Sequence, residues 1–169
     1  ETRDAETASI SVRAAITGHL VLSTLHTNDA VSSVIRLVDM GIEPYLLSSA
    51  LVGIVAQRLM RKVCPFCAQE TRLTDAEIDY VGRDVAHVRK AVGCPHCNGT
   101  GYSGRISIHE MLEIDKPMRE LISRGASTEE MKTYAIEKQH MKTLKTAGIE
   151  LMEQGITTLE ELRRVAYYE

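Results

Sequence analysis

The chain has 169 residues, of which 44% are hydrophobic and 25% are charged, and its formal net charge is −3. These proportions are typical of a soluble globular chain with one moderate core, and they exclude a short peptide and a disordered tail. No apolar run reaches the roughly 20 residues that cross a bilayer, and the polar opening segment is neither a signal peptide nor an anchor. We therefore expect a cytoplasmic location. Because basic and acidic residues are interspersed, nucleic acid is not an expected partner.

The first thirty residues predict a helix, a strand and the start of a second helix. Apolar residues recur at helical spacing over residues 4–17, and Gly18 follows as a stop signal. The run His19–Leu25 is short, β-prone and almost continuously apolar. Such a run predicts a strand buried on both faces, as in an α/β sheet. Helix should resume at Asn28 or Asp29.

Two further signals shape the segment up to residue 61. Gly41 is expected to end the second helix, and Pro44 stands where proline is tolerated, at the first turn of another helix. This third helix is predicted to run to about Met60. Its apolar character places it in the core or at a subunit contact.

Residues 62–114 differ in composition from the rest, because this stretch contains all four cysteines, two prolines and five glycines. A capping box formed by Thr74 and Glu77 predicts a short helix over residues 74–82. The best candidate for a strand or hairpin is Tyr102–Leu112. This segment is expected to be an appendage to the main core.

The remainder of the chain predicts helices. Capping boxes begin at Ser127 and Thr157, and further helices are expected over residues 117–124 and 142–154. The expected fold class is therefore α/β with a helical carboxyl-terminal region. The predicted domains are residues 1–61, 62–114 and 115–169.

The four cysteines form two C-x-x-C motifs, Cys64-Pro-Phe-Cys67 and Cys94-Pro-His-Cys97. Two such turns can present four thiolates to one tetrahedral Zn²⁺ at about 2.3 Å. The intervening stretch is longer than the common spacing of roughly 15–20 residues, so it should contain an element of its own. A closed shell of four sulfurs leaves no position for water, so this zinc would be structural.

Two alternatives to zinc remain open. A dithiol oxidoreductase would need the thiolate of Cys94 at the start of a helix, but a glycine-rich turn follows Cys97. Two disulfides would conflict with a cytoplasmic location. His96 could be a ligand, but with four cysteines available an exposed side chain is the expected state.

Two histidines, His19 and His26, stand at the two ends of the predicted buried strand. In α/β sheets, ligands bind beyond the carboxyl ends of strands, where His26 is expected. Thr27, Asn28 and the following helix start add donors suited to a phosphate. Hydrogen-bonded packing residues are the alternative for both histidines.

Taken together, these motifs resemble the carboxyl-terminal half of the secretion ATPases, the hexameric motors of type II secretion and type IV pilus assembly. The resemblance is collinear and covers essentially the whole chain. It rests on Glu1–Thr7, TGHLVLSTLHTNDA, DMGIEPYLLSSALVGIVAQRL, the two cysteine motifs, Gly101–Arg105 and Gly155–Glu160.

The resemblance implies that residues 1–61 are a truncated RecA-like nucleotide-binding core, followed by a tetracysteine zinc-binding element and a helical carboxyl-terminal region. It also implies a role for each motif. Glu1 corresponds to the glutamate of the family's Walker B segment, which polarises the attacking water, and Arg3 and Asp4 complete that segment. His19 and His26 correspond to the histidine box, in which His26 would sense the γ-phosphate of ATP bound with Mg²⁺. The cysteines correspond to a zinc element of assembly and secretion motors, which retraction motors generally lack. A homohexamer and an inner-membrane platform protein as partner are implied as well, with a peripheral position at the cytoplasmic face.

The sequence also departs from the family's pattern. Thr2 replaces the usual isoleucine, and Ile106-Ser107 stands where Thr-Gly is common. No G-x-x-x-x-G-K-[ST] loop occurs in the 169 residues. Because that loop holds the phosphates, we expect the chain to be a fragment of a larger ATPase and to be inactive alone. The alternative is a non-enzymatic, zinc-stabilised helical adaptor that binds a protein through residues 44–60.

Overall fold

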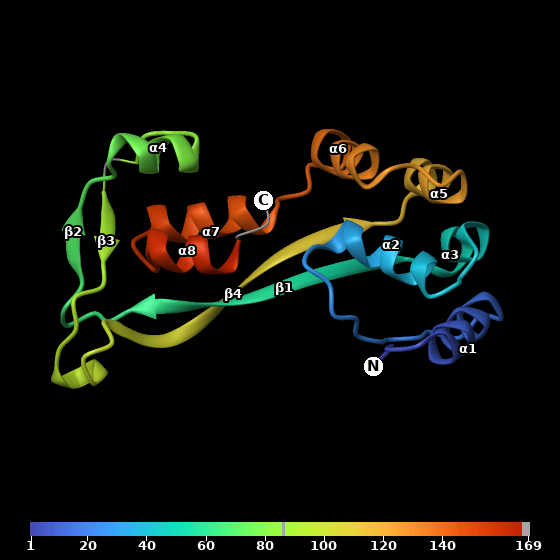
Figure 1. Cartoon of the computed structure of the whole chain (residues 1–169), viewed down its shortest axis with the longest axis horizontal. Helices are drawn as coiled ribbons and strands as arrows, with labels where there is room; N and C mark the ends of the chain where they lie inside the picture. The colour runs from blue at the N-terminus through green and yellow to red at the C-terminus, as the bar shows by residue number, and fades with distance from the viewer. Residues whose placement is uncertain (86, 167–169) are drawn as a thin grey trace. The chain divides into compact units, whose positions relative to one another are not determined.

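The computed structural model describes residues 1–85 and 87–166, which form two compact units (Figure 1). The first unit contains residues 1–56 and 110–142, and the second contains residues 57–109 and the segment from residue 143 onward. Helices and strands both occur, so the expected mixed α/β class is confirmed. The three sequence-based domains stay a prediction, and residues 167–169 of the last one lie outside the described residues.

Two long strands contribute to both units. β1 (Gly53–Val63) pairs with β4 (Tyr102–Glu113) in a two-stranded sheet. The pairing is antiparallel, because Ile114 N donates to Val52 O at one end and Cys64 N donates to Gly101 O at the other. β4 confirms the strand expected over residues 102–112.

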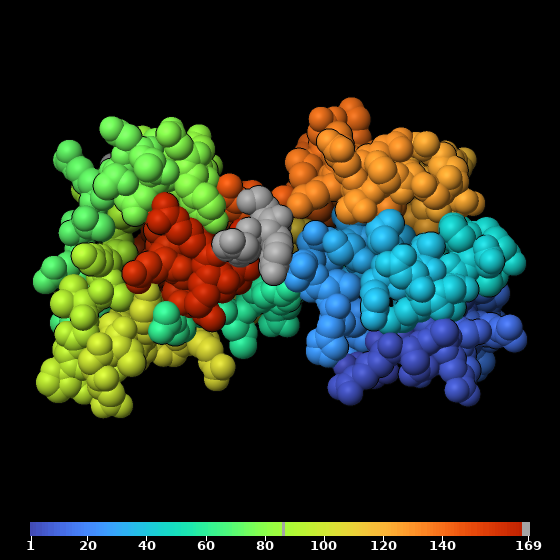
Figure 2. All heavy atoms as spheres, viewed as in Figure 1, coloured from blue at the N-terminus to red at the C-terminus, as the bar shows by residue number. Residues whose placement is uncertain are grey.

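The first unit is built from helices in layers. Figure 2 shows α1 in dark blue, α2 and α3 in lighter blue and α5 and α6 in orange, one layer next to another. α3 packs against both α1 and α5, and α6 packs against α5 and α2. The helices are α1 (Ala5–Ile16), α2 (Ala30–Asp39), α3 (Pro44–Ala50), α5 (Lys116–Ser123) and α6 (Thr128–Lys138).

Helix α2 begins and ends where its residues dictate. The Asp29 side chain accepts a hydrogen bond from the Ser32 N–H, which satisfies one of the free donors of the first turn. Val34 and Leu37 lie on its buried face. Gly41 follows with a φ of 87°, a conformation that other residues rarely adopt, and ends the helix as expected.

The second unit surrounds its strands with short helices. β2 (Gln69–Thr71) pairs antiparallel with β3 (Val88–Lys90), and the sequence did not predict this two-stranded sheet. Three α-helices belong here and match expected ones. They are α4 (Asp75–Val81), α7 (Leu144–Glu153) and α8 (Leu159–Val165), in which Thr158 rather than Thr157 caps the start.

A buried carboxylate ties α8 to β1 in the second unit. The Glu161 side chain is 0% exposed and accepts hydrogen bonds from Arg61 N, Arg61 Nε and the guanidinium of Arg164. The Arg61 guanidinium also stacks on the ring of Tyr102, whose hydroxyl lies 2.9 Å from Thr158 Oγ1. The network therefore connects β1, β4 and α8.

The predicted strand over His19–Leu25 is wrong. This segment is neither helix nor strand, and the side chains of Leu20 and Leu22 are both 87% exposed. A buried strand needs neighbouring strands on both sides, whereas among the described residues one backbone hydrogen bond, from Thr2 N to Thr24 O, connects it with another extended segment. The run is apolar as a buried strand would be, but in the part of the chain that the structure describes no strand pairs with it.

The predicted helix from Pro44 to about Met60 is also wrong in its second half. α3 ends at Ala50, and Gly53 begins β1. Along β1 the side chains alternate, with Ala56 and Met60 buried and their neighbours more exposed. A short apolar run can fit either the helical or the strand period, and here the β-branched residues and pairing with β4 favour the strand.

No helix within the described residues is long and apolar enough to cross a bilayer.

Candidate active site and metal centre

Glu1 and His26, predicted to act at the same site, are in contact in the first unit. His26 Nε2 lies 2.6 Å from Glu1 Oε1, and Arg3 Nη2 lies 2.6 Å from Glu1 Oε2. The His26 side chain is 83% exposed and that of Glu1 is 30% exposed. The pair is therefore accessible from solvent, so a substrate or another protein segment can reach both groups.

Two extended segments bring the pair together. Thr2 N donates to Thr24 O at 2.9 Å, and the hydroxyls of Thr2 and Ser23 lie 2.8 Å apart. Thr2 is only 4% exposed, whereas Ser23 and Thr24 are exposed, so this tie is half-buried. It sets the two segments side by side, which places Glu1 opposite His26.

The charges around Glu1 favour its ionised form. The hydrogen bond from Arg3 is the main cause of a lowered pKa of Glu1. Burial, the next largest influence, opposes it, and the contact with His26 lowers the pKa further. The carboxylate is thus charged at neutral pH. It can accept a hydrogen bond from water or from an imidazole N–H, as a water-orienting group must.

The other residues of this region have different positions. His19 lies at the end of α1, where its Nδ1 is 3.2 Å from Ala14 O, and it is not part of the Glu1–His26 contact. Asp4 caps α1 by accepting a hydrogen bond from Thr7 N at 2.8 Å. This bond is the main cause of the lowered pKa of Asp4. Asp4 thus has a structural role in addition to the one the resemblance implies.

The four cysteines converge in the second unit. Their Sγ atoms all lie within 4.8 Å of one another. The separations are 3.9 Å for Cys64–Cys94, 3.8 Å for Cys67–Cys97 and 3.8 Å for Cys94–Cys97. Four sulfurs at 2.3 Å from a tetrahedral ion would be about 3.8 Å apart. The donor set and its spacing therefore fit one metal ion.

Local backbone geometry orients these sulfurs. Cys97 Sγ accepts hydrogen bonds from Cys94 N at 3.2 Å and Gly101 N at 3.1 Å, and Cys67 Sγ accepts one from Gly93 N at 3.3 Å. Gly93 has a φ of 109°, and a Cβ there would lie 2.5 Å from Gly99 O. Only glycine fits this position, so the turn is specific to the site.

The thiols differ in acidity. Burial raises the pKa of the Cys67 thiol to about 11. Burial acts to raise the pKa of Cys97 as well, but the N–H groups of Cys94 and Gly101 outweigh it and lower that pKa to about 6. N–H donors aimed at sulfur stabilise thiolates, which is the form that binds a metal.

The structure bears on the alternatives to a metal site. All four cysteines are free thiols, and sulfurs 3.8–3.9 Å apart are well beyond the bonding distance of about 2.05 Å. Cys94 starts a single turn of 3-10 helix, Pro95–Cys97, rather than an α-helix, so it lacks the N-terminus that an oxidoreductase uses. His96 is exposed and stacks on Phe66, with ring centroids 4.3 Å apart.

Two buried glutamates were missed by the sequence reasoning. Glu110 and Glu161 are both 0% exposed. In β4, Glu110 stands between the buried apolar residues Ile108 and Leu112, so an acidic residue on the apolar face of an alternating strand was the available signal. Glu161 had no comparable signal, because acidic residues are common in the first turn of a helix.

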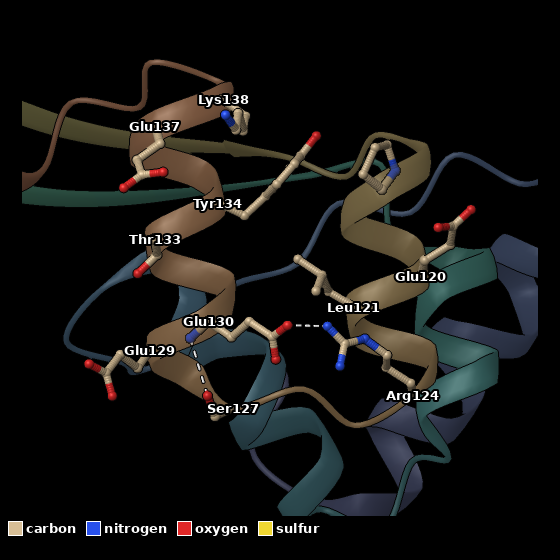
Figure 3. A pocket seen from close by; sticks show the side chains of 11 residues that line it. Glu120, Leu121, Arg124, Ser127, Glu129, Glu130, Thr133, Tyr134, Glu137 and Lys138 are labelled. Atoms are coloured by element: carbon tan, nitrogen blue, oxygen red, sulfur yellow. Dashed lines mark hydrogen bonds and ion pairs between the residues drawn. The ribbon is translucent and has the colours of Figure 1, made fainter.

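A groove of about 650 Å³ lies between α5 and α6 in the first unit (Figure 3). Arg124, which follows α5, and Glu130 of α6 form an ion pair across it, and Glu120, Glu129 and Glu137 add acidic groups. The sequence assigned no role to this region. The groove contains neither Glu1 nor His26 and is separate from the cysteines.

Comparison with known proteins matches the chain, over residues 1–164, to the family described as Type II/IV secretion system protein. The type II secretion system protein HxcR of Pseudomonas aeruginosa is 47% identical over 165 residues, which is 98% of this chain and 32% of that protein. The type IV pilus assembly ATPase PilB of Thermus thermophilus is 46% identical over 167 residues, 96% of this chain and 19% of that protein. The chain thus spans a third or less of the length of these relatives.

Solved structures show the same fold. The pilus retraction motor PilT with bound ADP superposes with a TM-score of 0.65 at 27% identity, covering 98% of this chain and 37% of that one. The ATPase DotB of Legionella pneumophila superposes with a TM-score of 0.63 at 20% identity, covering 100% of this chain and 37% of that one. Because the family model matches residues 1–164 of this chain, the chain belongs to the type II/IV secretion system proteins.

Proposed function

We propose that the chain is part of a hexameric ATPase that powers type IV pilus assembly or type II secretion. The observation that carries the proposal is the 2.6 Å contact between Glu1 and His26, two residues far apart in sequence that the family resemblance assigns to one catalytic site. Relatives at 46–47% identity are named as a pilus assembly ATPase and a type II secretion protein. The contact and the names of these relatives both support the proposal.

In this proposal Glu1 orients and polarises the water that attacks the γ-phosphate. Its carboxylate is held ionised by Arg3, and its Oε1 is shared with the imidazole of His26. His26 senses the γ-phosphate and couples its loss to motion of the segment between α1 and α2. His19 contributes to nucleotide binding. Mg²⁺ with ATP would neutralise the developing charge, as in other phosphoryl transfers.

The cysteine centre holds a structural zinc ion in this proposal. The sulfur spacing, the N–H donors and the absence of a disulfide among the four support it. A Cys₄ shell has no open position, so the ion stabilises the knuckles and takes no part in hydrolysis. The partners are further copies of the same subunit and an inner-membrane platform protein, and the location is the cytoplasmic face of that membrane.

The test replaces Glu1→Gln and His26→Ala in the intact ATPase. We expect kcat to fall by a factor on the order of 10² to 10⁴ in each variant, because a positioned acid–base group contributes about that much. Matched controls are Glu137→Gln and His87→Ala, two exposed residues of the same types outside the motifs of the family resemblance. Wild-type turnover in both test variants would reject the catalytic assignment and favour the adaptor.

A second experiment concerns the isolated chain. Because no phosphate-binding loop occurs in its 169 residues, the purified chain should hydrolyse ATP no faster than the background rate. Metal analysis of the same sample should give one equivalent of zinc. Turnover above background that Glu1→Gln abolishes would contradict the expected inactivity.

A further inference from the structure

The carboxylate of Glu110 on β4 contacts the first turn of α2. Glu110 Oε1 accepts a hydrogen bond from Ala30 N at 2.9 Å, and the side chain of Glu110 is 0% exposed. The two residues are 80 positions apart in the chain. This bond therefore connects β4 with α2, the helix that follows His26 in the chain.

The position is an unusual one for an acidic side chain. Its neighbours on the buried face of β4 are Ile108 and Leu112, each 2% exposed. Burying a carboxylate costs several kcal/mol in principle unless hydrogen bonds and charges compensate, so packing alone would favour an apolar residue here. The free N–H groups and the positive end of the α2 dipole supply part of that compensation.

The first turn of α2 divides its donors between two acidic residues. Asp29 takes the N–H of Ser32 at 2.6 Å, whereas Glu110 takes the N–H of Ala30. The cap of the helix is thus complete only when β4 is in place. Removing Glu110 would leave the buried N–H of Ala30 without this acceptor.

His26 lies just before this turn, on a segment with no regular structure of its own. On its amino-terminal side the segment is held by Thr2, through Ser23 and Thr24. On its other side Thr27 Oγ1 contacts Asp29 O at 3.2 Å and Ser33 Oγ at 2.8 Å, which ties the segment to α2. The position of His26 therefore depends on the position of the α2 start.

We propose that Glu110 is a positioning residue that sets the Glu1–His26 pair by anchoring the first turn of α2 to β4. It acts through hydrogen bonding and touches no substrate. The inference rests on the proposed ATPase function for its kinetic consequence, whereas its structural consequence can be measured without turnover. A shift of about 1 Å in a catalytic group can lower a rate by a factor of about 10².

The experiment compares two variants of nearly equal volume in the intact ATPase. Glu110→Gln keeps a side-chain oxygen that can accept from Ala30 N–H, whereas Glu110→Met removes it. We expect kcat to fall about tenfold or more in Glu110→Met, with KM for ATP within about twofold, and to stay within about threefold of wild type in Glu110→Gln. Equal kcat in Glu110→Met and wild type, in an enzyme that Glu1→Gln inactivates, would overturn the inference.

A double-mutant cycle tests whether Glu110 acts through His26. In a His26→Ala background, Glu110→Met should change kcat by less than about twofold, because there is no imidazole left to misplace. An unchanged tenfold loss in that background would mean a general structural effect and would reject the positioning role. Glu161→Gln, at another glutamate with no exposed surface, is the matched control for destabilisation and should lower kcat equally in both backgrounds if it lowers it at all.

Hydrogen exchange of the intact protein separates this inference from the proposed function. In Glu110→Met, the amides of residues 26–33 should exchange faster, while those of α5 keep wild-type rates. Faster exchange without loss of kcat, together with active Glu1→Gln, would reject the catalytic assignment but keep the anchoring contact. Unchanged exchange over residues 26–33 would reject the anchor itself.

Discussion

The tetracysteine centre and the Glu1–His26 pair are assembled in opposite ways. The cysteines come from two tight turns, and their sulfurs accept three backbone N–H hydrogen bonds within the site. Glu1 and His26 lie on extended segments joined by one tie at Thr2, and the His26 side chain is 83% exposed. One site is closed and locally determined, and the other is open and depends on distant contacts.

Because of this difference, we expect the cysteine centre to contribute to folding and the Glu1–His26 pair to be accessible to a substrate. A buried centre with many ties contributes to folding but has no room for a substrate. An exposed pair contributes little to folding, because solvent screens its charges, yet it can meet a nucleotide. We therefore expect substitutions in the two sites to affect different measurements, with effects on stability that decrease in the order given below.

The largest loss of stability is expected from Cys64→Ser. Structural zinc binding contributes on the order of 10 kcal/mol to folding in small domains, and a three-sulfur shell loses most of this. Metal analysis should fall from one equivalent to a substoichiometric amount, and calorimetry should show a lower Tm. His96→Ala is the control and should retain the metal, because His96 is exposed and outside the sulfur cluster. A full equivalent in both Cys64→Ser and Cys94→Ser would exclude the four-thiolate site.

The next largest effect is expected from Glu161→Ala. Removing one partner of a buried, hydrogen-bonded charge network costs about 3–5 kcal/mol, and here Arg61 and Arg164 would lose their acceptor. Urea unfolding measures the loss, with the exposed Glu137→Gln as control. A loss of unfolding free energy below about 1 kcal/mol would mean that water solvates the two guanidinium groups nearly as well as the carboxylate does.

The same residue predicts a pH dependence. Burial acts to raise the pKa of Glu161, but hydrogen bonds from Arg164 and Arg61 outweigh it and lower the pKa from 4.5 to about 2. The stabilisation is fully present above pH 4.5, and it is lost as the pH falls from there towards 2. The difference in unfolding free energy between wild type and Glu161→Gln should shrink over that range. A constant difference would contradict the network.

A smaller effect is expected from Gly148→Ala in α7. A Cβ there would lie 2.5 Å from Leu162 Cδ1 and 3.4 Å from Met60 Sδ. Overpacking of this kind costs about 1–3 kcal/mol, which outweighs the gain of about 1 kcal/mol that alanine brings to a helix interior. Thermal unfolding should show net destabilisation. A stabilised variant would show that Leu162 can move aside.

The smallest effect on stability is expected from Glu1→Gln. The pair is exposed, so we expect no measurable change in Tm by calorimetry. Asp29→Ala, nearby in the same site, should instead cost about 1 kcal/mol, because it removes the cap of α2. A Tm loss in Glu1→Gln as large as that in Asp29→Ala would break the comparison between the open and the closed site.

Local signals in the sequence predicted several elements correctly. The capping box at Thr74, the cap at Ser127 and the stop at Gly41 all act where expected. The cysteine cluster was also predictable, because two C-x-x-C turns need to meet only once to bring four sulfurs together. These signals involve groups a few residues apart, so the chain's own covalent geometry limits the outcomes.

Errors arose where an element depends on its neighbours. The run His19–Leu25 has the composition of a buried strand, but Leu20 and Leu22 are exposed because no strands flank it within the described residues. The apolar residues after Ala50 fit both the helical and the strand period, and pairing with β4 makes the segment a strand. An apolar composition indicates that a segment prefers to be buried, but it does not indicate which elements will cover that segment.

The sequence by itself determined several helix starts and stops and a set of four cysteines that could hold a metal ion. Through the family resemblance it also pointed to Glu1 and His26 as candidate site residues. Only the tertiary structure decided that Glu1 and His26 touch, that His19 lies apart from them, and that Glu110 reaches Ala30. Contacts between residues this far apart depend on how strands and helices pack, which no local pattern records. Burial of Glu110 and Glu161 is likewise a property of packing, because an acidic residue is buried only where distant donors are brought to meet it.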